Sequence, residues 1–372
     1  KKIKKNDIFF AIKGKKKDGN HYLREVFNKK ASLAIVNKIN KLEKKSKQIK
    51  VKNTLSFLTK TSSKVRENSS AKIIAITGSC GKTSLKELIG MTLNKLCSVT
   101  YSRKSFNNKF GVPLSLFNLN PKDDFGVFEV GMDKKGEIDA LTKIIKPEVG
   151  VITNISYAHA KNFKNLKQIA LAKSEIMNNI VSGGSIVLNA DDIFYKFHRK
   201  KALKKKLKVY SFSINKKNAT VSLISIKKEK SKFKVIMNID NQKKYFFISS
   251  NFENNLKNLL AAITVISIFK DIKTINKNIF YNYQIPYGRG DFSKIKINRK
   301  NILLIDESYN SNPLSLTSAI NNFDLIDNKN KKKHVILGDM LELGKHSRKL
   351  HLKMSDIINS SSIDTVNVFG KY

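Results

Sequence analysis

Short apolar runs alternate with amphipathic stretches along most of the chain, as in strands that are each followed by a helix. Between residues 71 and 190 the apolar runs are IIAI, FGVF, VGVI and IVL, and helices are expected to begin near Lys82, Glu137 and Leu166. Strands that alternate with helices form mostly parallel sheets with helices on both faces. The central part of the chain is therefore predicted to be an α/β unit with a parallel sheet.

The flanking parts of the chain show three further patterns. Residues 8–60 predict a small N-terminal α/β unit, and the polar, serine-rich stretch 59–72 predicts a linker. Residues 206–249 contain β-rich runs without helices between them, which predicts an antiparallel appendage before a helix that begins near Asn255. After a Gly-Arg-Gly turn, strands and helices alternate again. We therefore expect three domains, at residues 1–70, 71–287 and 288–372.

The length and the two ends of the sequence refine this division. At 372 residues the chain has room for two or three domains with large buried cores. The first residue is Lys1 and not Met, and the last residues, VNVFGKY, have the pattern of a strand entering a turn. We expect a chain truncated at both ends, with an incomplete C-terminal domain.

The charge is strongly positive, but its distribution weakens the obvious interpretation. Lys and Arg total 72 against 29 Asp and Glu, a formal net charge of +43, which alone would indicate a nucleic-acid or anionic-membrane partner. Only seven of these residues are Arg, whereas proteins that read phosphates and bases favour the forked guanidinium. The lysines are also dispersed. We therefore interpret the charge as a solvated surface and expect neither a nucleic-acid nor a membrane partner.

Cysteine usage and hydropathy exclude several classes of protein. Cys80 and Cys97 are the only cysteines, without a CxxC pair, so neither a disulfide framework nor a structural zinc site is supported. No stretch approaches the roughly 18 apolar residues of a membrane-spanning helix, and the N-terminus lacks the apolar segment of a signal peptide. A cytoplasmic protein is expected.

The strongest chemical signal is KIIAITGSCGKTSLKELI, in which an apolar strand leads through a glycine-containing loop into a helix. Glycines let the backbone approach a phosphate, the helix N-terminus faces the anion, a lysine adds charge and a hydroxyl reaches Mg²⁺. The spacing is G-x-x-G-K-T, because Ile76 stands where the longer motif has its first Gly. A P-loop is predicted, with an ordinary turn as the alternative, at Gly78, Ser79, Cys80, Gly81, Lys82, Thr83 and Ser84.

Three further residues are candidates for a metal site beside this loop. Glu129 ends an apolar strand, at the edge where ligands collect in open α/β sheets. His159 follows another strand end, although a lone histidine is more often structural. Lys173 falls on the apolar face of its helix, where burial would lower its pKa and favour the neutral amine; extension of its side chain to the surface is the alternative.

Taken together, these motifs resemble the ATP-dependent Mur ligases over the whole chain. The similar segments are DIFFAIKGKKKDGNHYL, TGSCGKTSLKE, SFNNKFGVPLSL, FEVGMDKKGEID, TNISYAHAKNF, LAKSEI, NNLKNLLAA, LLIDESYNSNP and VILGDMLELG. The last two resemble the member that joins D-alanyl-D-alanine to UDP-N-acetylmuramoyl-tripeptide in peptidoglycan synthesis. The resemblance implies three domains: an N-terminal α/β domain, a central P-loop parallel sheet and a Rossmann-like C-terminal domain. It also implies a monomer.

The resemblance also implies a role for each matching residue. Lys82 and Thr83 would bind phosphate and Mg²⁺, and Glu129 would be a metal carboxylate. His159 and a carbamylated Lys173 would hold a second Mg²⁺. Residues implied to bind ATP are Asn255, Asn258, Arg289, Asp306 and Asn310, and residues implied to bind the UDP-sugar and peptide are Lys13, Gly14, Asp18, Gly19, Asn107 and Asn108.

The sequence departs from the family pattern in two motifs, and other functions stay open. Asn254 stands where the family commonly has His, and the N-terminal DGH element has become Asp18-Gly19-Asn20. Within the same class, a sister Mur ligase or a folylpolyglutamate-type synthetase is the alternative. From another class, a basic P-loop ATPase acting on nucleic acid is the alternative, although it would require clustered Arg and interleaved aromatic residues.

Overall fold

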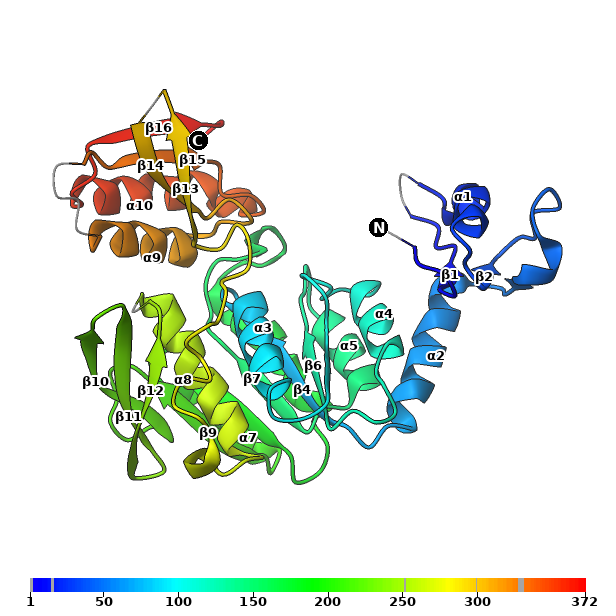
Figure 1. Cartoon of the computed structure of the whole chain (residues 1–372), viewed down its shortest axis with the longest axis horizontal. Coiled ribbons are helices and arrows are strands. Elements are labelled where there is room, and N and C mark those ends of the chain that lie inside the picture. The colour runs from blue at the N-terminus through cyan, green and yellow to red at the C-terminus, as the bar shows by residue number, and fades with distance from the viewer. Residues whose placement is uncertain (1–2, 15–16, 251, 299, 327–330) are drawn as a thin grey trace.

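The computed structural model describes residues 3–14, 17–250, 252–298, 300–326 and 331–372. Figure 1 shows a large central region flanked by an N-terminal region in blue and a C-terminal region in orange and red. Short 3₁₀ helices occur in all three regions: η1 Gly19–Tyr22, η2 Lys45–Lys47, η3 Ala160–Asn162, η4 Ser174–Asn178, η5 Ile272–Thr274 and η6 Gly344–His346. Among the described helices, none combines the length and the apolar character that crossing a membrane requires.

The N-terminal region is a small parallel sheet in the order β1-β2-β3. The apolar side chains of β2 pack against those of α1, which forms a small core of its own. Its elements are β1 Ile8–Phe10, α1 Leu23–Asn28, β2 Leu33–Val36, β3 Gln48–Lys50 and α2 Thr54–Glu67.

The predicted linker at 59–72 is wrong, because α2 extends through most of it to Glu67. The helix is polar, but Leu58, Ser62 and Arg66 recur at four-residue spacing and are all buried. Arg66 donates from Nε to the Ile145 carbonyl at 2.8 Å and pairs with Glu148 at 2.8 Å. These polar contacts dock the helix on the central region, and a reading of apolar periodicity alone overlooks them.

The central region confirms the prediction of a mostly parallel sheet. Nine strands lie in the order β12-β11-β10-β9-β8-β7-β4-β6-β5. The strands are β4 Lys72–Thr77, β5 Val99–Tyr101, β6 Phe125–Glu129, β7 Val149–Ile152, β8 Ser185–Asn189, β9 Lys208–Ser213, β10 Val221–Glu229, β11 Lys232–Ile239 and β12 Gln242–Ile248. The helices are α3 Lys82–Leu93, α4 Gly111–Phe117, α5 Glu137–Ile145, α6 Leu166–Lys173, α7 Tyr195–Lys204 and α8 Glu253–Ser267.

Helices cover both faces of this sheet. Along β4, Ile73 and Ala75 belong to the apolar core shared with α5 and α6, while Ile74 and Ile76 belong to the core shared with α3 and α8. This alternation follows from the two-residue period of a strand. A central strand buried on both faces explains why KIIAIT is almost continuously apolar.

The β-rich segment extends the central sheet, and its first strand differs from the expectation of an antiparallel appendage. β9 pairs in parallel with both β8 and β10. Antiparallel pairing is confined to the β10-β11-β12 meander. The chain between β8 and β9 contains α7, a strongly basic helix, and it provides the crossover connection that parallel neighbours need.

In the part of the C-terminal region that the structure describes, the chain forms two two-stranded sheets and the α-helices α9 and α10. β13 and β14 form an antiparallel hairpin, whereas β15 and β16 are parallel. α9 begins with a capping box in which Asn312 accepts from the backbone of Ser315, and the Ser315 hydroxyl accepts from the backbone of Asn312. The elements are β13 Asp291–Ile297, β14 Lys300–Asp306, α9 Pro313–Asp324, β15 His334–Gly338, α10 Ser347–Asn359 and β16 Thr365–Phe369.

Candidate active site

The predicted P-loop lies between β4 and α3, and two of its positions require glycine. Gly78 and Gly81 have φ of +146° and +79°. A Cβ at Gly78 would lie 1.8 Å from Thr153 Oγ1, and one at Gly81 would lie 3.1 Å from Asn258 Oδ1. The first turn of α3 leaves backbone N–H groups without helical acceptors, so this tight loop presents donors to an anion.

The segment that follows β7 holds the loop in place. The backbone N–H groups of Ser79 and Cys80 donate to the Asn154 carbonyl and to Asn154 Oδ1, at 3.0 and 2.9 Å. Thr153 Oγ1 donates to the Cys80 carbonyl at 2.6 Å. These hydrogen bonds fix the conformation of the loop. Burial raises the pKa of the Cys80 thiol, which argues against a reactive thiolate at this position.

Two lysines donate to the Gly78 carbonyl. Lys82 Nζ donates to it at 2.8 Å and lines the cavity, while Lys173 Nζ donates to it at 2.9 Å from the interior. Lys173 is only 1% exposed, which confirms its predicted inward position. Burial, reinforced by the charge of Lys82, lowers the pKa of Lys173 well below its ordinary value. Burial also lowers the pKa of Lys82, against the opposing effect of Glu129.

Oxygen ligands suited to Mg²⁺ meet at the start of α3. Thr83 Oγ1 donates to Glu129 Oε2 at 2.7 Å, and Asn107 Nδ2 donates to Glu129 Oε1 at 2.7 Å. Glu129 is 1% exposed, so both of its oxygens are held in fixed positions. A hydroxyl beside a carboxylate is the donor set that a hard divalent cation prefers.

Residues from the C-terminal region face the P-loop across the same cavity. Arg289 Nη2 and the Tyr309 hydroxyl donate to Ser105 Oγ at 3.1 and 2.8 Å, and the Arg289 guanidinium lies 4.1 Å from the centre of the Tyr309 ring. Asn312 Nδ2 donates to Cys80 Sγ at 3.0 Å. The sequence alone indicates no role for Ser105, Tyr309 or Asn312, although the last two lie in the SYNSNP segment.

The cavity has a volume of about 300 Å³. Loop residues from Ser79 to Ser84 form its floor, and Asn255 and Asn258 line it from the start of α8. The predicted residues that it brings together are Ser79, Cys80, Gly81, Lys82, Thr83, Ser84, Asn107, Glu129, His159, Asn255, Asn258, Arg289 and Asn310. A single cavity therefore collects most of the nucleotide and metal candidates.

Other predicted residues lie outside the cavity. Asp306 ends β14 and accepts from the Ser308 backbone at 2.8 Å, whereas the adjacent Glu307 lines the cavity, because successive side chains of an extended chain point to opposite sides. Asn108 Oδ1 accepts from Phe110 and Gly111 at the start of α4.

The four N-terminal candidates lie close together, on either side of residues 15–16 and apart from the cavity. Lys13 and Asp18 form an isolated antiparallel β-bridge, Gly14 N–H donates to the Lys17 carbonyl, and Gly19 N–H donates to the Ile12 carbonyl. This group lies in the blue region of Figure 1, which α2 joins to the central region. Among the predicted P-loop residues, Gly78 also lies outside the cavity lining, and its carbonyl accepts hydrogen bonds from Lys82 and Lys173.

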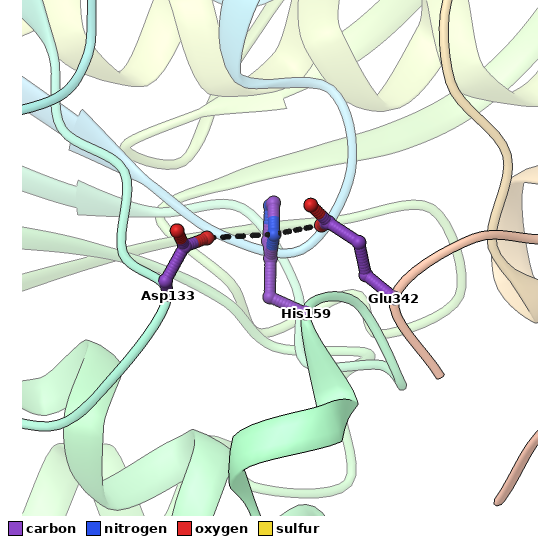
Figure 2. Close-up of side chains that lie close together, drawn as sticks. All are labelled: Asp133, His159 and Glu342. Atoms are coloured by element: carbon purple, nitrogen blue, oxygen red, sulfur yellow. Dashed lines mark ion pairs between the residues drawn. The ribbon is translucent and has the colours of Figure 1, made fainter. Parts of the chain in front are cut away.

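His159 lies between two carboxylates, Asp133 and Glu342, for which the sequence alone predicts no role. Its Nδ1 is 3.2 Å from Asp133 Oδ1 and also forms an ion pair with Glu342 (Figure 2). Burial and the nearby Lys82 lower the pKa of His159 below its ordinary value, and the opposing effects of Glu342 and Asp133 are smaller. Asp133 and Glu342 belong to the quoted motifs EVGMD and GDMLELG, but their approach depends on how the C-terminal region docks.

A P-loop at the carboxyl end of a central parallel strand, with a buried carboxylate beside it and basic residues in the same cavity, defines a nucleotide-dependent enzyme. The family model described as the Mur ligase middle domain matches residues 76–266. The chain is 34% identical to UDP-N-acetylmuramoyl-tripeptide–D-alanyl-D-alanine ligase of Rickettsia prowazekii, over 100% of this chain and 81% of that protein. The chain therefore belongs to the Mur ligase family.

Solved structures agree with this assignment. MurF from Acinetobacter baumannii superposes with a TM-score of 0.86 at 28% identity, covering 99% of this chain and 78% of that one. The MurF ligase of Thermotoga maritima, solved in complex with ADP, has a TM-score of 0.81 at 24% identity, with 99% and 82% covered, and so shares the fold. The predicted three-domain Mur ligase architecture is confirmed, while the positions of the domain boundaries stay predictions.

Proposed function

We propose that the chain catalyses the ATP-dependent joining of D-alanyl-D-alanine to UDP-N-acetylmuramoyl-tripeptide in peptidoglycan precursor synthesis. One observation carries the proposal for these residues: the P-loop Lys82 and the C-terminal Arg289 and Asn310 line one cavity. The similarity to the Rickettsia enzyme, which has this name, supports the same reaction here. The SYNSNP and GDMLELG segments support it over a sister Mur ligase or a folylpolyglutamate-type synthetase.

The reaction needs an activated carboxylate. A carboxylate oxygen of the tripeptide attacks the γ-phosphorus of ATP, ADP leaves, and an acyl phosphate is formed. The amine of D-alanyl-D-alanine then attacks the acyl carbon, phosphate leaves and the nitrogen loses a proton. The protein's task is to position these groups and to stabilise the charge that develops on phosphate and acyl oxygens.

The residues around the cavity fit the first step. Lys82 from the central region and Arg289 from the C-terminal region would bring positive charge to the transferred phosphoryl group, and Asn255 and Asn258 would contact the nucleotide from α8. Thr83 and Glu129 would hold Mg²⁺, which neutralises phosphate charge when bound. Glu307, which lines the cavity next to Asp306, is suited to the ribose hydroxyls of ATP.

Lys173 fits a carbamate that would serve a second Mg²⁺ together with His159. A buried lysine with a strongly lowered pKa has a neutral amine available. That amine adds to CO₂ and releases a proton, so a lysine becomes an anion. An anion in this interior position would also be attracted by the positive charge of Lys82, which lies close enough to help lower the pKa of Lys173.

The peptide and sugar contacts remain assignments by resemblance. Asn107, fixed by Glu129, faces the cavity and is suited to the peptide end of the substrate. Asn108 lies beside it. The N-terminal group of Lys13, Gly14, Asp18 and Gly19 would bind the uridine diphosphate sugar far from the reacting carboxylate. A substrate of this length needs contacts in more than one region.

Phosphate release from ATP tests the proposal directly. We expect release only when UDP-N-acetylmuramoyl-tripeptide and D-alanyl-D-alanine are both present, with one phosphate for each peptide bond, and no response to DNA or RNA. Turnover that requires glutamate or diaminopimelate in place of the dipeptide would identify a sister ligase. Turnover stimulated by nucleic acid and indifferent to the dipeptide would identify the ATPase alternative.

A further inference from the structure

The buried Lys86 has no part in the proposed reaction, although it lies close to the P-loop in the sequence. It follows Lys82 by about one turn of α3, and its side chain is 0% exposed. Among the described lysines, only Lys173 and Lys333 are also buried. An ammonium group is costly to remove from water unless hydrogen-bond acceptors or an opposite charge replace the water. The groups around Lys86 Nζ therefore indicate what this lysine does.

Lys86 Nζ is bound by the segment that follows β5. It donates to the Lys104 carbonyl at 2.9 Å and to the Ser102 carbonyl, and it forms an ion pair with Glu87, the next residue on α3. Two carbonyls and a carboxylate thus replace the water that burial removes from the ammonium group. One side chain thereby ties the P-loop helix to residues 102–107, which we call the site loop.

The site loop contains a strained turn at one of these carbonyls. Lys104 has a φ of +50°, in the left-handed region that residues other than glycine rarely adopt. Its own side chain is exposed, while its carbonyl is held by Lys86. A conformation of this kind persists only where the surrounding contacts fix it. The hydrogen bond from Lys86 is such a contact, and a glycine would adopt the same turn without strain.

The turn leads directly into Ser105, which lines the cavity and contacts both regions around it. Ser105 Oγ lies 3.3 Å from Thr83 Oγ1 on the P-loop helix. It also accepts from Arg289 Nη2 at 3.1 Å and from the Tyr309 hydroxyl at 2.8 Å. Because the direction of the chain after residue 104 depends on its φ, a change of the turn would move this oxygen away from its partners.

We propose that Lys86 is a positioning residue: it holds the turn at Lys104 and so keeps Ser105 where the C-terminal region docks. Lys86 does not line the cavity, so it acts through the site loop. The effect on turnover rests on the function proposed above, in which Arg289 brings charge to the transferred phosphoryl group. The P-loop itself is held by the segment after β7, so loss of Lys86 should affect turnover more than the binding of ATP.

Lys86→Met tests the proposal, because methionine is also unbranched but cannot donate to the two carbonyls. Lys95→Met is the matched control: Lys95 follows the same helix and donates to the Ile279 carbonyl at 2.8 Å, outside the site loop. The first readout is hydrogen exchange of peptides that cover residues 102–107 and, separately, residues 79–84, measured on the whole chain without substrates. The second is kcat and KM for ATP in phosphate release that depends on D-alanyl-D-alanine.

We expect Lys86→Met to speed hydrogen exchange in the site loop and to leave exchange in the P-loop unchanged. Its kcat should fall about tenfold, the factor that a left-handed backbone preference corresponds to, with a KM for ATP near that of the wild type. Adding Lys104→Gly to Lys86→Met should restore most of the kcat, since glycine needs no support in this turn. Lys95→Met should behave as the wild type.

Unchanged exchange in the site loop of Lys86→Met would overturn the proposal. So would a fall in kcat that Lys104→Gly does not relieve, because Lys86 would then act on overall stability and not on the turn. Ser105→Ala keeps the test open if Lys86→Met does not fold: it should lower kcat to a similar degree, and wild-type turnover would refute the role of the site loop in docking. If the wild type itself releases no phosphate in response to the dipeptide, the proposed function fails, and hydrogen exchange still decides whether Lys86 positions the loop.

Discussion

At the residue scale, two lysines that donate to the same carbonyl have different chemistry because of where their side chains lie. Lys82 reaches Gly78 from the cavity, and Lys173 reaches it from the core. The first can therefore meet a phosphate of ATP directly. Lys173, which is buried, can react only at its own nitrogen or act on a metal ion that lies next to it.

Replacement of Lys82 by Ala should abolish turnover with little change in stability. The side chain is half-buried and donates to backbone carbonyls, but no apolar core depends on it. Loss of a preorganised charge at a phosphoryl group costs about 100-fold or more in kcat. ATP-dependent phosphate release and thermal unfolding would measure the two effects, with the exposed Lys122→Ala as control. Near-normal turnover of Lys82→Ala would remove the P-loop assignment.

Lys173→Ala should also be nearly inactive, but for a different reason. The substitution removes the nitrogen on which a carbamate forms, and a short-chain carboxylic acid that enters the vacated space should restore part of the activity. Lys173→Arg should stay inactive, because a guanidinium remains charged and does not react with CO₂. The measurement is phosphate release with and without acetate or propionate. Full activity of either variant would show that Lys173 is a structural lysine.

At the element scale, apolar periodicity predicts the elements that bury apolar faces. The strands KIIAIT, FGVFE and VGVI and the helices after them lie where the sequence indicates, since each has one or two faces in an apolar core. Apolar periodicity does not predict α2 through residue 67, because polar side chains, Ser62 and Arg66, form much of its buried face. The sequence pattern groups β9 with the antiparallel strands that follow it. Its parallel pairing with β8 depends on the crossover through α7, and the apolar pattern of the strand itself does not indicate this.

The contact between α6 and α7 should make stability depend on pH. His198 is 2% exposed, its Nε2 lies 3.1 Å from the Ala170 carbonyl, and burial lowers its pKa from 6.5 to about 4. Between these values the unfolded chain binds a proton that the native protein does not. This contribution to the free energy of unfolding is therefore present above pH 6.5 and is lost as the pH falls towards 4, by about 3 kcal/mol in all.

Urea unfolding at pH 7 and pH 4.5 would measure this loss. His198→Gln keeps a donor for the Ala170 carbonyl but does not titrate, so its free energy of unfolding should fall less over the same interval. Arg199→Gln, on the same helix but exposed, is the matched control. Equal acid sensitivity of His198→Gln and the wild type would contradict the prediction.

At the scale of the whole molecule, the active site is shared between regions that are distant in sequence. The P-loop was predictable because its residues are consecutive and their chemistry is local. Ser105, Asn312 and Glu342 were not assigned, because their roles come from contacts across the interface between the central and C-terminal regions. A motif indicates that such residues belong to the family pattern, but only their spatial neighbours indicate what each one does.

The same interface should respond to ATP. Lys82 and Arg289 line one cavity and both are positive, so without an anion between them they oppose the approach of the two regions. The polar contacts between the two regions include Arg289 to Ser105 and Asn312 to Cys80, at 3.1 and 3.0 Å. Triphosphate binding would replace the repulsion by attraction on both sides, as in other enzymes that close on a nucleotide.

We therefore expect the region after Tyr287 to move as a unit towards the central region when a non-hydrolysable ATP analogue binds. The turn at Gly288-Arg289-Gly290 is the natural hinge, because Gly288 and Gly290 both have positive φ, of 72° and 91°. Small-angle scattering should give a smaller radius of gyration with the analogue than without it. Arg289→Met should bind the analogue and remain expanded, because its C-terminal region lacks the charge that contacts the phosphates. Identical scattering curves for the wild type with and without saturating analogue would contradict a closing motion and would make the docked arrangement the resting state of the protein.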